Sequence, residues 1–231
     1  MKLFFLNMMI FSSVSVMSST ILLDQIPLPD LRPTMYYIAN ESKTACDGRY
    51  NGNDFDGSEV SEILTPEGDL IAKVCTRFFK VLSMEGTGIL ADRGQGEQTV
   101  NWAGDYRFKV MDKCIYGEGV DNLCLIPYHT IAADLTVYPV NTLIYIPRAE
   151  GLKLPNGKIH NGYFVVRDTG GAFRGIGPKR VDLFVGTEED RDNIFSRIGM
   201  SHHVDEKAFR IEGKRKASIF MKFKREYPNL F

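Results

Sequence analysis

Three aspartates have the side-chain type and the surroundings of acid–base groups. Asp134 precedes an apolar run, Asp168 opens a glycine-rich turn, and Asp182 stands between Val181 and Leu183. Because side chains alternate between the two faces of a strand, Asp182 points away from both neighbours. If the three carboxyls converge, repulsion and partial burial raise the pKa of at least one, which makes it a general acid near neutral pH. The alternative for each aspartate is a solvated charge on the wet face of an edge strand.

The elements that must hold these aspartates are predicted to be short β-strands. Apolar runs rich in Val, Ile, Tyr or Phe, each closed by Gly, Pro, Asn or Asp, indicate strands whose spacing favours a barrel or a sandwich. A helix is predicted over residues 187–198, because Thr187 can cap it, acidic residues fill its first turn and Gly199 ends it. The predicted strands cover residues 72–82, 106–111, 135–138, 142–146, 163–166, 181–185 and 217–223.

The residues before these strands are predicted to be extended and then loop-rich. Three prolines interrupt residues 25–33, which indicates an extended lead-in. Residues 47–69 hold seven acidic residues against one arginine, interleaved with glycines. Such a region is most often a solvated face, although an acidic rim also attracts cationic ligands.

The overall charge excludes a dedicated nucleic-acid binder. The 231 residues include 28 Lys and Arg against 29 Asp and Glu, a net charge of −1, whereas nucleic-acid-binding domains usually carry a basic surplus. The near-zero net charge arises because two regions of opposite charge offset each other: residues 47–69 carry −6 and residues 201–231 carry +4. A hydrophobic fraction of 44% is that of a globular protein with a sizeable core.

The amino terminus has the composition of a secretory signal peptide. Met1 and Lys2 precede a short apolar run, and small residues follow up to Thr20. The run is too short to span a membrane, so we expect cleavage after about residue 19 and a soluble, exported protein, either periplasmic or secreted. The alternative is a buried amino-terminal strand or helix.

Export determines how the four cysteines are interpreted, because an oxidising compartment favours disulfides. Four cysteines allow three pairings. Cys114 and Cys124 bracket a glycine-rich loop, so we favour this pair together with Cys46 and Cys75. A zinc site is the alternative, but no C-x-x-C pair or His-rich spacing supports one, and no metal is expected.

The segments around the aspartates resemble the three-aspartate (3D) domain of the membrane-bound lytic transglycosylase A family. The resemblance implies a mainly β fold with a six-stranded double-psi β-barrel at residues 72–231, an inserted loop at about 92–130, a carboxy-terminal strand, and a loop-rich, acidic extension at 20–71. Residues 74–90 are expected to supply the first barrel strand. The matching motifs are Asp134-x-x-x-x-Pro139-x-x-Thr142, Val166-x-Asp168-Thr169-Gly170-Gly171-Ala172-Phe173-x-Gly175 and Arg180-x-Asp182-Leu183-Phe184-x-Gly186.

The resemblance also implies an activity. The family cleaves the β-1,4 bond between N-acetylmuramic acid and N-acetylglucosamine and leaves a 1,6-anhydro sugar. Its acid/base carboxylate falls on Asp182, with Asp168 and Asp134 as supporting carboxylates. No cofactor is implied; the expected partner is the peptidoglycan glycan strand, bound by a monomer without stable membrane insertion. An acidic rim at residues 47–69 would favour de-N-acetylated, cationic glycan.

Residues that flank the aspartates are the expected substrate-binding groups. The two glycines let the backbone approach a saccharide closely. The arginines are candidates for contacts with muramic or peptide carboxylates, although each is more often solvated or salt-bridged. Single aromatics such as Trp102, Tyr106 and Tyr128 could line a glycan groove but are more often core residues. The expected substrate-binding residues are Thr169, Gly170, Gly171, Arg167, Arg174 and Arg180.

Three other functions are compatible with parts of the sequence. A hydrolytic muramidase would use the same site but let water intercept the intermediate. A non-catalytic barrel would hold glycan without cutting it. Asp168-Thr169-Gly170 is also the aspartic-protease signature, but such an enzyme needs a second aspartate from a repeated lobe or a dimer. No second Asp-Thr-Gly or Asp-Ser-Gly occurs in the chain.

Overall fold

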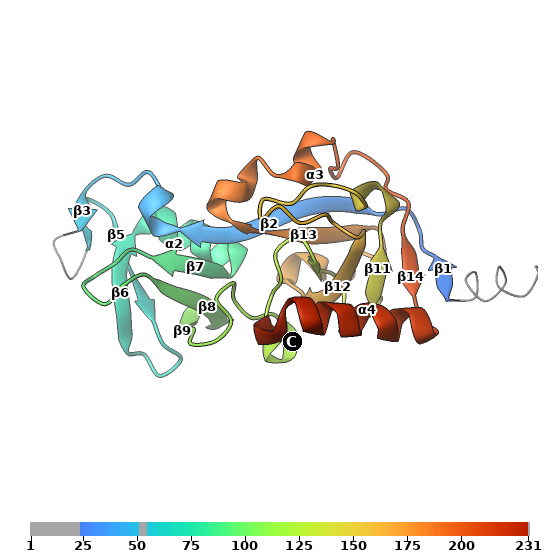
Figure 1. The fold of residues 1–231 in the computed structure, drawn as a ribbon. Helices are drawn as coiled ribbons and strands as arrows, with labels where there is room; N and C mark the ends of the chain where they lie inside the picture. Colours follow the sequence, from blue (N-terminus) through green and yellow to red (C-terminus); the bar gives the residue numbers. More distant parts are fainter. Residues whose placement is uncertain (1–23, 51–54, 231) are drawn as a thin grey trace, which may run out of the picture.

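A mixed β-sheet of ten strands runs through the length of the molecule (Figure 1). The computed structural model describes residues 24–50 and 55–230, so the predicted signal peptide lies outside the described residues. The strand order is β1-β14-β11-β12-β10-β13-β2-β7-β8-β9. The strands are β1 (Gln25–Pro27), β2 (Arg32–Asn40), β7 (Thr87–Leu90), β8 (Gln98–Gly104), β9 (Arg107–Val110), β10 (Thr130–Ala132), β11 (Leu143–Tyr145), β12 (Tyr163–Asp168), β13 (Arg180–Thr187) and β14 (Phe209–Ile211).

Two hairpins and a few helices complete the described part of the chain. The hairpins are β3 (Arg49–Tyr50) with β4 (Phe55–Asp56) and β5 (Val60–Leu64) with β6 (Leu70–Cys75). The α-helices are α2 (Thr76–Glu85), α3 (Ile194–Arg197) and α4 (Gly213–Glu226). In the part of the chain that the structure describes, no helix is long and apolar enough to cross a membrane. The 3-10 turns are η1 (Glu41–Lys43), η2 (Val120–Asn122), η3 (Pro147–Ala149), η4 (Gly171–Phe173), η5 (Glu188–Arg191) and η6 (Pro228–Leu230).

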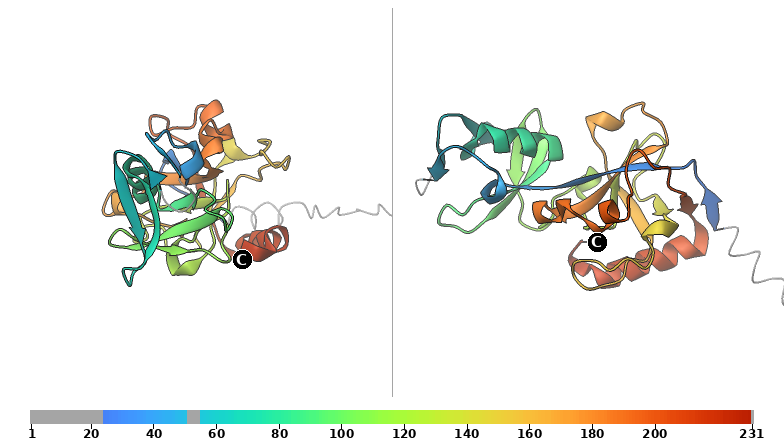
Figure 2. Two further views of the ribbon diagram at one scale, coloured as in Figure 1. Left: turned by 90° about the vertical axis from the view of Figure 1, so that its left-hand side faces the viewer. Right: turned by 90° about the horizontal axis from the view of Figure 1, so that it is seen from above.

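Strand β2 joins two lobes, as the right-hand view in Figure 2 shows. Its first part pairs in parallel with β13 in the large lobe, and its end pairs in parallel with β7 in the small lobe. The small lobe holds α2 and β3–β9 around Phe78, Val100 and Phe108, which are fully buried. The core of the large lobe lies beneath β10, β12 and β13, around Ile131 and Leu183.

The strands of the large lobe form part of this open sheet, not the closed six-stranded barrel that we expected. Strand β2, which the sequence placed in the loop-rich extension, lies inside the sheet, where it pairs with β13 from Arg32 to Ile38 and then with β7. Residues 74–90, which were expected to supply the first barrel strand, instead form the end of β6, helix α2 and strand β7. The boundary drawn at residue 72 stays a prediction.

Four predicted strands are confirmed and three are wrong wholly or in part. Strands β9, β11, β12 and β13 lie where the sequence placed them. Residues 135–138 form a turn, and residues 217–223 lie within helix α4. Residues 76–82, which were taken as the end of a strand, belong to helix α2.

Both helices that replaced strands bury apolar residues at helical spacing. In α2, Phe78 and Leu82 face the core, the sulfur of Cys75 accepts the N–H of Phe78 at 3.4 Å, and Gly86 ends the helix at a φ of 82°. In α4, the buried residues are likewise four positions apart. A spacing of four places both side chains on one helix face, but it also keeps them on one face of a strand, so the spacing alone does not separate the two.

The helix predicted over 187–198 is interrupted, and both predicted disulfides are present. Asn193 separates η5 from α3 and caps α3, since its side chain accepts the N–H groups of Phe195 and Ser196. Gly199 follows with a φ of 77°, as expected for a helix end. The disulfides join Cys46 to Cys75 and Cys114 to Cys124.

Candidate active site

The strand register brings two of the three aspartates to one place. Ala132 of β10 is the register partner of Asp168 on β12 and of Asp182 on β13. Register partners share a face of the sheet, so the two carboxylates flank Ala132 on that face. Thr34 of β2 pairs with Asp182 and extends the row. A one-residue shift between β10 and β12 places Asp168, and not Arg167, opposite Ala132.

Asp182 is the carboxylate best suited to exchange a proton with a ligand. Its neighbours Val181 and Leu183 are fully buried on the opposite face of β13, as the sequence predicted. Burial raises the pKa of Asp182 to about 6; Arg180 opposes this rise and the charge of Asp168 adds to it. The Oδ1 atom of Asp182 is buried and has no hydrogen-bond partner. A buried polar atom without a partner is rare and marks a position for a ligand group.

Asp168 lies between a backbone donor and a tyrosine. Burial raises the pKa of Asp168 to about 6, although the Thr169 N–H donates to its Oδ1 at 2.8 Å and favours the charged form. The hydroxyl of Tyr36 faces this carboxylate without a hydrogen bond of standard geometry. Burial and then the charge of Asp168 raise the pKa of Tyr36 well above its ordinary value. Tyr36 therefore stays protonated and offers a neutral hydroxyl beside Asp168.

Asp134 has a different environment from the other two aspartates. Its Oδ1 accepts the hydroxyl of Thr136 at 2.7 Å and the N–H of Thr136 at 3.0 Å, and its Oδ2 accepts the N–H of Gly175 at 3.1 Å. The hydroxyl, more than the two amides, lowers the pKa of Asp134. Asp134 thus remains ionised and fastens the turn after β10 to the end of the glycine-rich loop.

The glycine-rich loop after β12 is open to ligands. A side-chain carbon added at Gly171 would have no protein atom within 4 Å, and one at Gly170 would meet only the ring of Phe173 at 3.8 Å. Thr169 is directed inward, because its hydroxyl donates to the carbonyl of Ala133 at 2.9 Å. The two glycines therefore leave space above the loop, whereas Thr169 holds the loop to β10.

Arg167 has a structural position away from the carboxylates. It is 2% exposed, and its Nη1 donates to the carbonyls of Cys124 and Leu230, each at 2.7 Å. Burial lowers the pKa of Arg167 to about 10. The side chain joins the Cys114–Cys124 loop to the carboxy-terminal turn and is not available to a substrate at Asp182.

A cationic pocket of about 490 Å³ adjoins Asp182 through Thr34 and Arg180. The buried Oγ1 of Thr34 and the Nε of Arg180 have no hydrogen-bond partner. The Arg180 guanidinium lies 5.7 Å from the ring centroid of Phe173, while Arg174 is exposed. The pocket is lined by Arg32, Thr34, Ile176, Lys179, Arg180 and His202.

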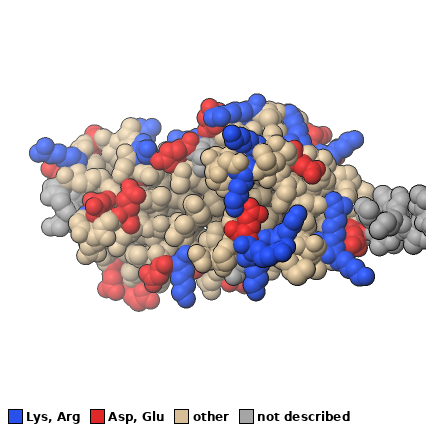
Figure 3. Space-filling model, in the orientation of Figure 1, with Lys and Arg blue, Asp and Glu red and all other residues tan. Residues whose placement is uncertain are grey.

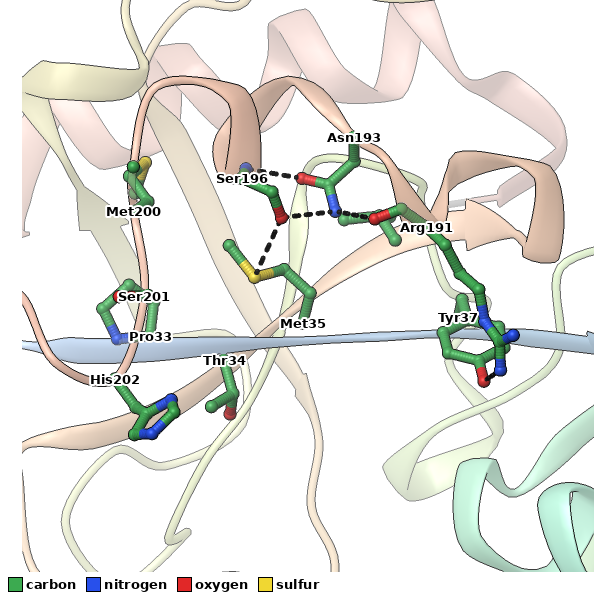
Figure 4. A pocket seen from close by; sticks show the side chains of 12 residues that line it. Pro33, Thr34, Met35, Tyr37, Arg191, Asn193, Ser196, Met200, Ser201 and His202 are labelled. Carbon is green, nitrogen blue, oxygen red and sulfur yellow. Dashed lines mark hydrogen bonds between the residues drawn. The ribbon is translucent and has the colours of Figure 1, made fainter.

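A second pocket, of about 380 Å³, shares Thr34 and His202 with the first (Figure 4). Some of its polar groups bond one another, since Asn193 bonds Ser196, and the Ser196 hydroxyl reaches the sulfur of Met35. None of the three aspartates lines either pocket. The cationic pocket is the better candidate for substrate binding, because Lys179 and Arg180, which lie just before Asp182 on the same strand or its approach, line it.

The described residues contain no cluster of three His, Cys, Asp or Glu side chains that could hold a metal ion. His129 and His160 stack in the core with their ring centroids 4.5 Å apart. Burial lowers the pKa of His129 to about 4 and that of His160 to about 3. Both imidazoles are neutral packing groups at physiological pH.

The sequence identified the carboxylates of this site but missed several of its neighbours. The structure brings together Asp168, Asp182 and Arg180, with Asp134 at the loop behind them. Thr34 and Tyr36 were missed because β2 lies far away in sequence, and no local pattern signals a parallel partner. Lys179 had a visible signal, since it directly precedes the Arg180-x-Asp182 motif.

Comparison with known proteins agrees with the three-aspartate motif. Residues 129–205, which include all three aspartates, match the 3D domain. A search of curated proteins gives no match.

Solved lytic transglycosylases are similar in structure to this chain at low sequence identity. The membrane-bound lytic murein transglycosylase of Agrobacterium tumefaciens is 14% identical with a TM-score of 0.52, over 86% of this chain and 78% of that one. MltA of E. coli with bound chitohexaose is 13% identical with a TM-score of 0.49, over 79% and 71%. LtgG of Burkholderia pseudomallei is 15% identical with a TM-score of 0.41, over 87% and 80%.

Proposed function

We propose that this chain, whose residues 129–205 are a 3D domain, is a peptidoglycan lytic transglycosylase. It would cleave the β-1,4 bond between N-acetylmuramic acid and N-acetylglucosamine and leave a 1,6-anhydro end. The observation that carries the proposal is Asp182, a partly buried carboxyl with a pKa of about 6 and a buried, unpartnered oxygen. Its register partner Thr34 and the nearby Arg180 line the cationic pocket. The double-psi barrel that a 3D domain implies is part of the proposal.

The proposed reaction uses one carboxyl twice. Protonated Asp182 donates its proton to the glycosidic oxygen as the bond from that oxygen to the anomeric carbon breaks. The resulting carboxylate then accepts the proton of the sugar's own primary hydroxyl while that oxygen bonds to the anomeric carbon. Asp182 ends protonated, and no water enters the product. A carboxyl with a pKa near 6 is suited to both steps, since it gains and loses its proton near neutral pH.

The neighbouring groups support this cycle. The negative charge of Asp168 helps to keep Asp182 protonated. Tyr36 offers a neutral hydroxyl beside Asp168. Asp134, fixed by three hydrogen bonds, positions the glycine-rich loop and does not exchange protons near neutral pH.

The cationic pocket fits an anionic substituent of the glycan. Lys179 and Arg180 lie beside Asp182 in sequence and line the pocket, and Arg32 lines it while paired with Asp205 at 2.6 Å. Muramic acid and its peptide both present carboxylates, which guanidinium and ammonium groups bind well. Arg174, Gly170 and Gly171 remain proposed contacts at the open side of the loop. Thr169 and Arg167 are assigned structural roles instead.

The two rival functions on this site differ in their products. A hydrolytic muramidase would release ends that carry an added water, and a glycan-binding barrel would release nothing. The unpartnered, protonatable Asp182 favours an enzyme over a binding module, because a binding groove has no need of such an acid. Incubating the protein with purified sacculi and weighing the released muropeptides tests all three, since an anhydro end is one water lighter than a hydrolysed one.

The acidic region at residues 47–69 does not enter the proposed site. Its described residues form the hairpin β3–β4 and strand β5, at the end of the small lobe away from β13 (Figure 1). On the face in Figure 3, acidic side chains gather on that lobe and basic ones on the large lobe. Exposed charges act weakly beyond about 8 Å at physiological salt.

We therefore expect equal digestion rates for N-acetylated and de-N-acetylated sacculi at 0.15 M salt. Parallel turbidity assays at 0.15 M and 0.01 M salt measure this. A preference for deacetylated wall that persists at the higher salt would place the acidic hairpins at the glycan after all.

The protein is proposed to act outside the cytoplasm. Its two disulfides are typical of proteins that fold in an oxidising compartment. Peptidoglycan lies in that compartment, so the location agrees with the proposed substrate.

A further inference from the structure

The small lobe carries a cluster of three aromatic side chains, here called the aromatic platform. It consists of Phe79 on α2, Trp102 on β8 and Tyr106 in the turn between β8 and β9. The rings of Phe79 and Tyr106 stack with centroids 6.4 Å apart, and Trp102 meets Tyr106 edge-on at 5.3 Å. Tyr106 is 60% exposed although two aromatic neighbours hold its ring in place. A large ring that is fixed and yet solvent-facing is available to a ligand.

The backbone beneath Tyr106 is unfavourable for a tyrosine. Gly104 pairs with Arg107, so Asp105 and Tyr106 form a two-residue turn, with φ of 47° and 54°. Such a turn strongly prefers glycine at its second position, and a bulky residue with a left-handed backbone costs about 1 kcal/mol. Stability of the fold therefore does not explain a tyrosine here, whereas presentation of its ring does.

The platform belongs to the junction between the lobes. The N–H of Trp102 donates to the carbonyl of Gly86 at 2.7 Å. The preceding residue, Glu85, accepts the N–H of Tyr37 on β2 at 3.2 Å. The pKa of Tyr36 is raised by burial, by the charge of Asp168 and also by the charge of Glu85. One continuous set of contacts thus leads from the carboxylates to the platform.

We propose that the aromatic platform is a distal subsite that stacks against a hexosamine ring of the glycan strand being cleaved at Asp182. The apolar face of a pyranose ring, formed by its C–H groups, matches an exposed aromatic ring, while its hydroxyl and acetamido groups suit polar neighbours such as Asp105 and Arg107. Sites for small ligands typically combine aromatic surface with a few polar groups in this way. This inference rests on the proposed function, because the ligand is the same glycan.

Replacing Tyr106 with glycine separates ring presentation from stability. Tyr106→Gly removes the ring and relieves the left-handed backbone, so the melting temperature should stay the same or rise. Affinity for the N-acetylglucosamine hexamer, measured by calorimetry in the Asp182→Asn background to prevent cleavage, should fall about tenfold or more. Tyr106→Phe keeps the ring and should bind within about threefold of the parent. Val110→Ala, which trims an exposed side chain on the same hairpin, should change nothing.

Binding and cleavage can fail independently in this design. If the parent binds the hexamer but sacculi are never cleaved, the proposed function fails while the subsite stands. Equal affinity of Tyr106→Gly and the parent overturns the subsite, as does a Tyr106→Phe variant that binds as weakly as Tyr106→Gly. If the parent self-associates, and Tyr106→Gly abolishes this self-association but leaves the affinity for the hexamer unchanged, the platform binds a second copy of this chain instead.

Discussion

Asp182→Asn is expected to reduce release of soluble muropeptides from sacculi at pH 6 by at least about 10³-fold, the upper range for loss of a general acid–base group. The amide can neither donate the proton to the leaving oxygen nor accept one from the primary hydroxyl, so both halves of the reaction are lost. Chromatography of the soluble fraction measures the rate. Asp192→Asn, which changes an exposed aspartate paired with Arg197, is the matched control and should keep full activity.

The same substitution is expected to stabilise the fold at neutral pH. The folded-state pKa of Asp182, about 6, lies above its ordinary value of 3.8 because burial disfavours the charged form. The carboxylate therefore lowers the free energy of unfolding. This loss is complete at pH values above the folded-state pKa and absent at pH values below the unfolded-state pKa. Asparagine has no such cost, so Asp182→Asn should gain about 1 to 3 kcal/mol at pH 7.5 and nothing near pH 3.5.

Thermal unfolding at both pH values checks this expectation. A gain that does not depend on pH, or a loss of stability at pH 7.5, would mean that the carboxyl is not buried as described. If the variant is inactive and also less stable, misfolding could explain its loss of activity. An inactive variant that is more stable assigns the loss to chemistry.

Asp168→Asn is expected to move the pH profile of the reaction. The charge of Asp168 is one cause of the raised pKa of Asp182, after burial. Without that charge the pKa of Asp182 falls, and the alkaline limb of the rate profile, which follows loss of the acid form, moves to lower pH. At pH 7.5 the rate should fall about tenfold, whereas near pH 5 it should change little.

A full pH–rate profile of wild type and variant makes this measurement. The two aspartates are coupled, so the limbs report apparent values of the pair. Asp134→Asn serves as the comparison, because Asp134 has a lowered pKa and should not shift the alkaline limb. An unchanged limb in Asp168→Asn would contradict the electrostatic link between the two carboxylates.

The sequence predicted strands best where β-branched and aromatic runs end in turn residues. Strands β12 and β13 have these signals and lie where they were expected. Helices α2 and α4 were missed because their apolar residues also fit a partly alternating pattern, and only tertiary packing selected the four-residue spacing. The run after Asp134 was taken for a strand, but the side chain of Asp134 bonds the backbone two residues on and stabilises a turn.

The site was predictable as a motif but not as an arrangement. The motif singled out Asp182 and Asp168 as the candidate acid–base residues. Nothing local could show that β2 pairs in parallel with β13, which brings Thr34 and Tyr36 to the site. Arg167 was predicted to bind substrate because it adjoins Asp168 in sequence. Its side chain instead points into the protein and donates to carbonyl groups.

Digestion of sacculi in water enriched in oxygen-18 tests the central proposal most directly. If Asp182 serves first as acid and then as base for the sugar's own hydroxyl, mass spectrometry will show muropeptides one water lighter than the hydrolysed form and without oxygen-18 at the new end. Released muropeptides that carry one oxygen-18 atom at that end would show that water attacks the anomeric carbon, and would contradict the transglycosylase mechanism.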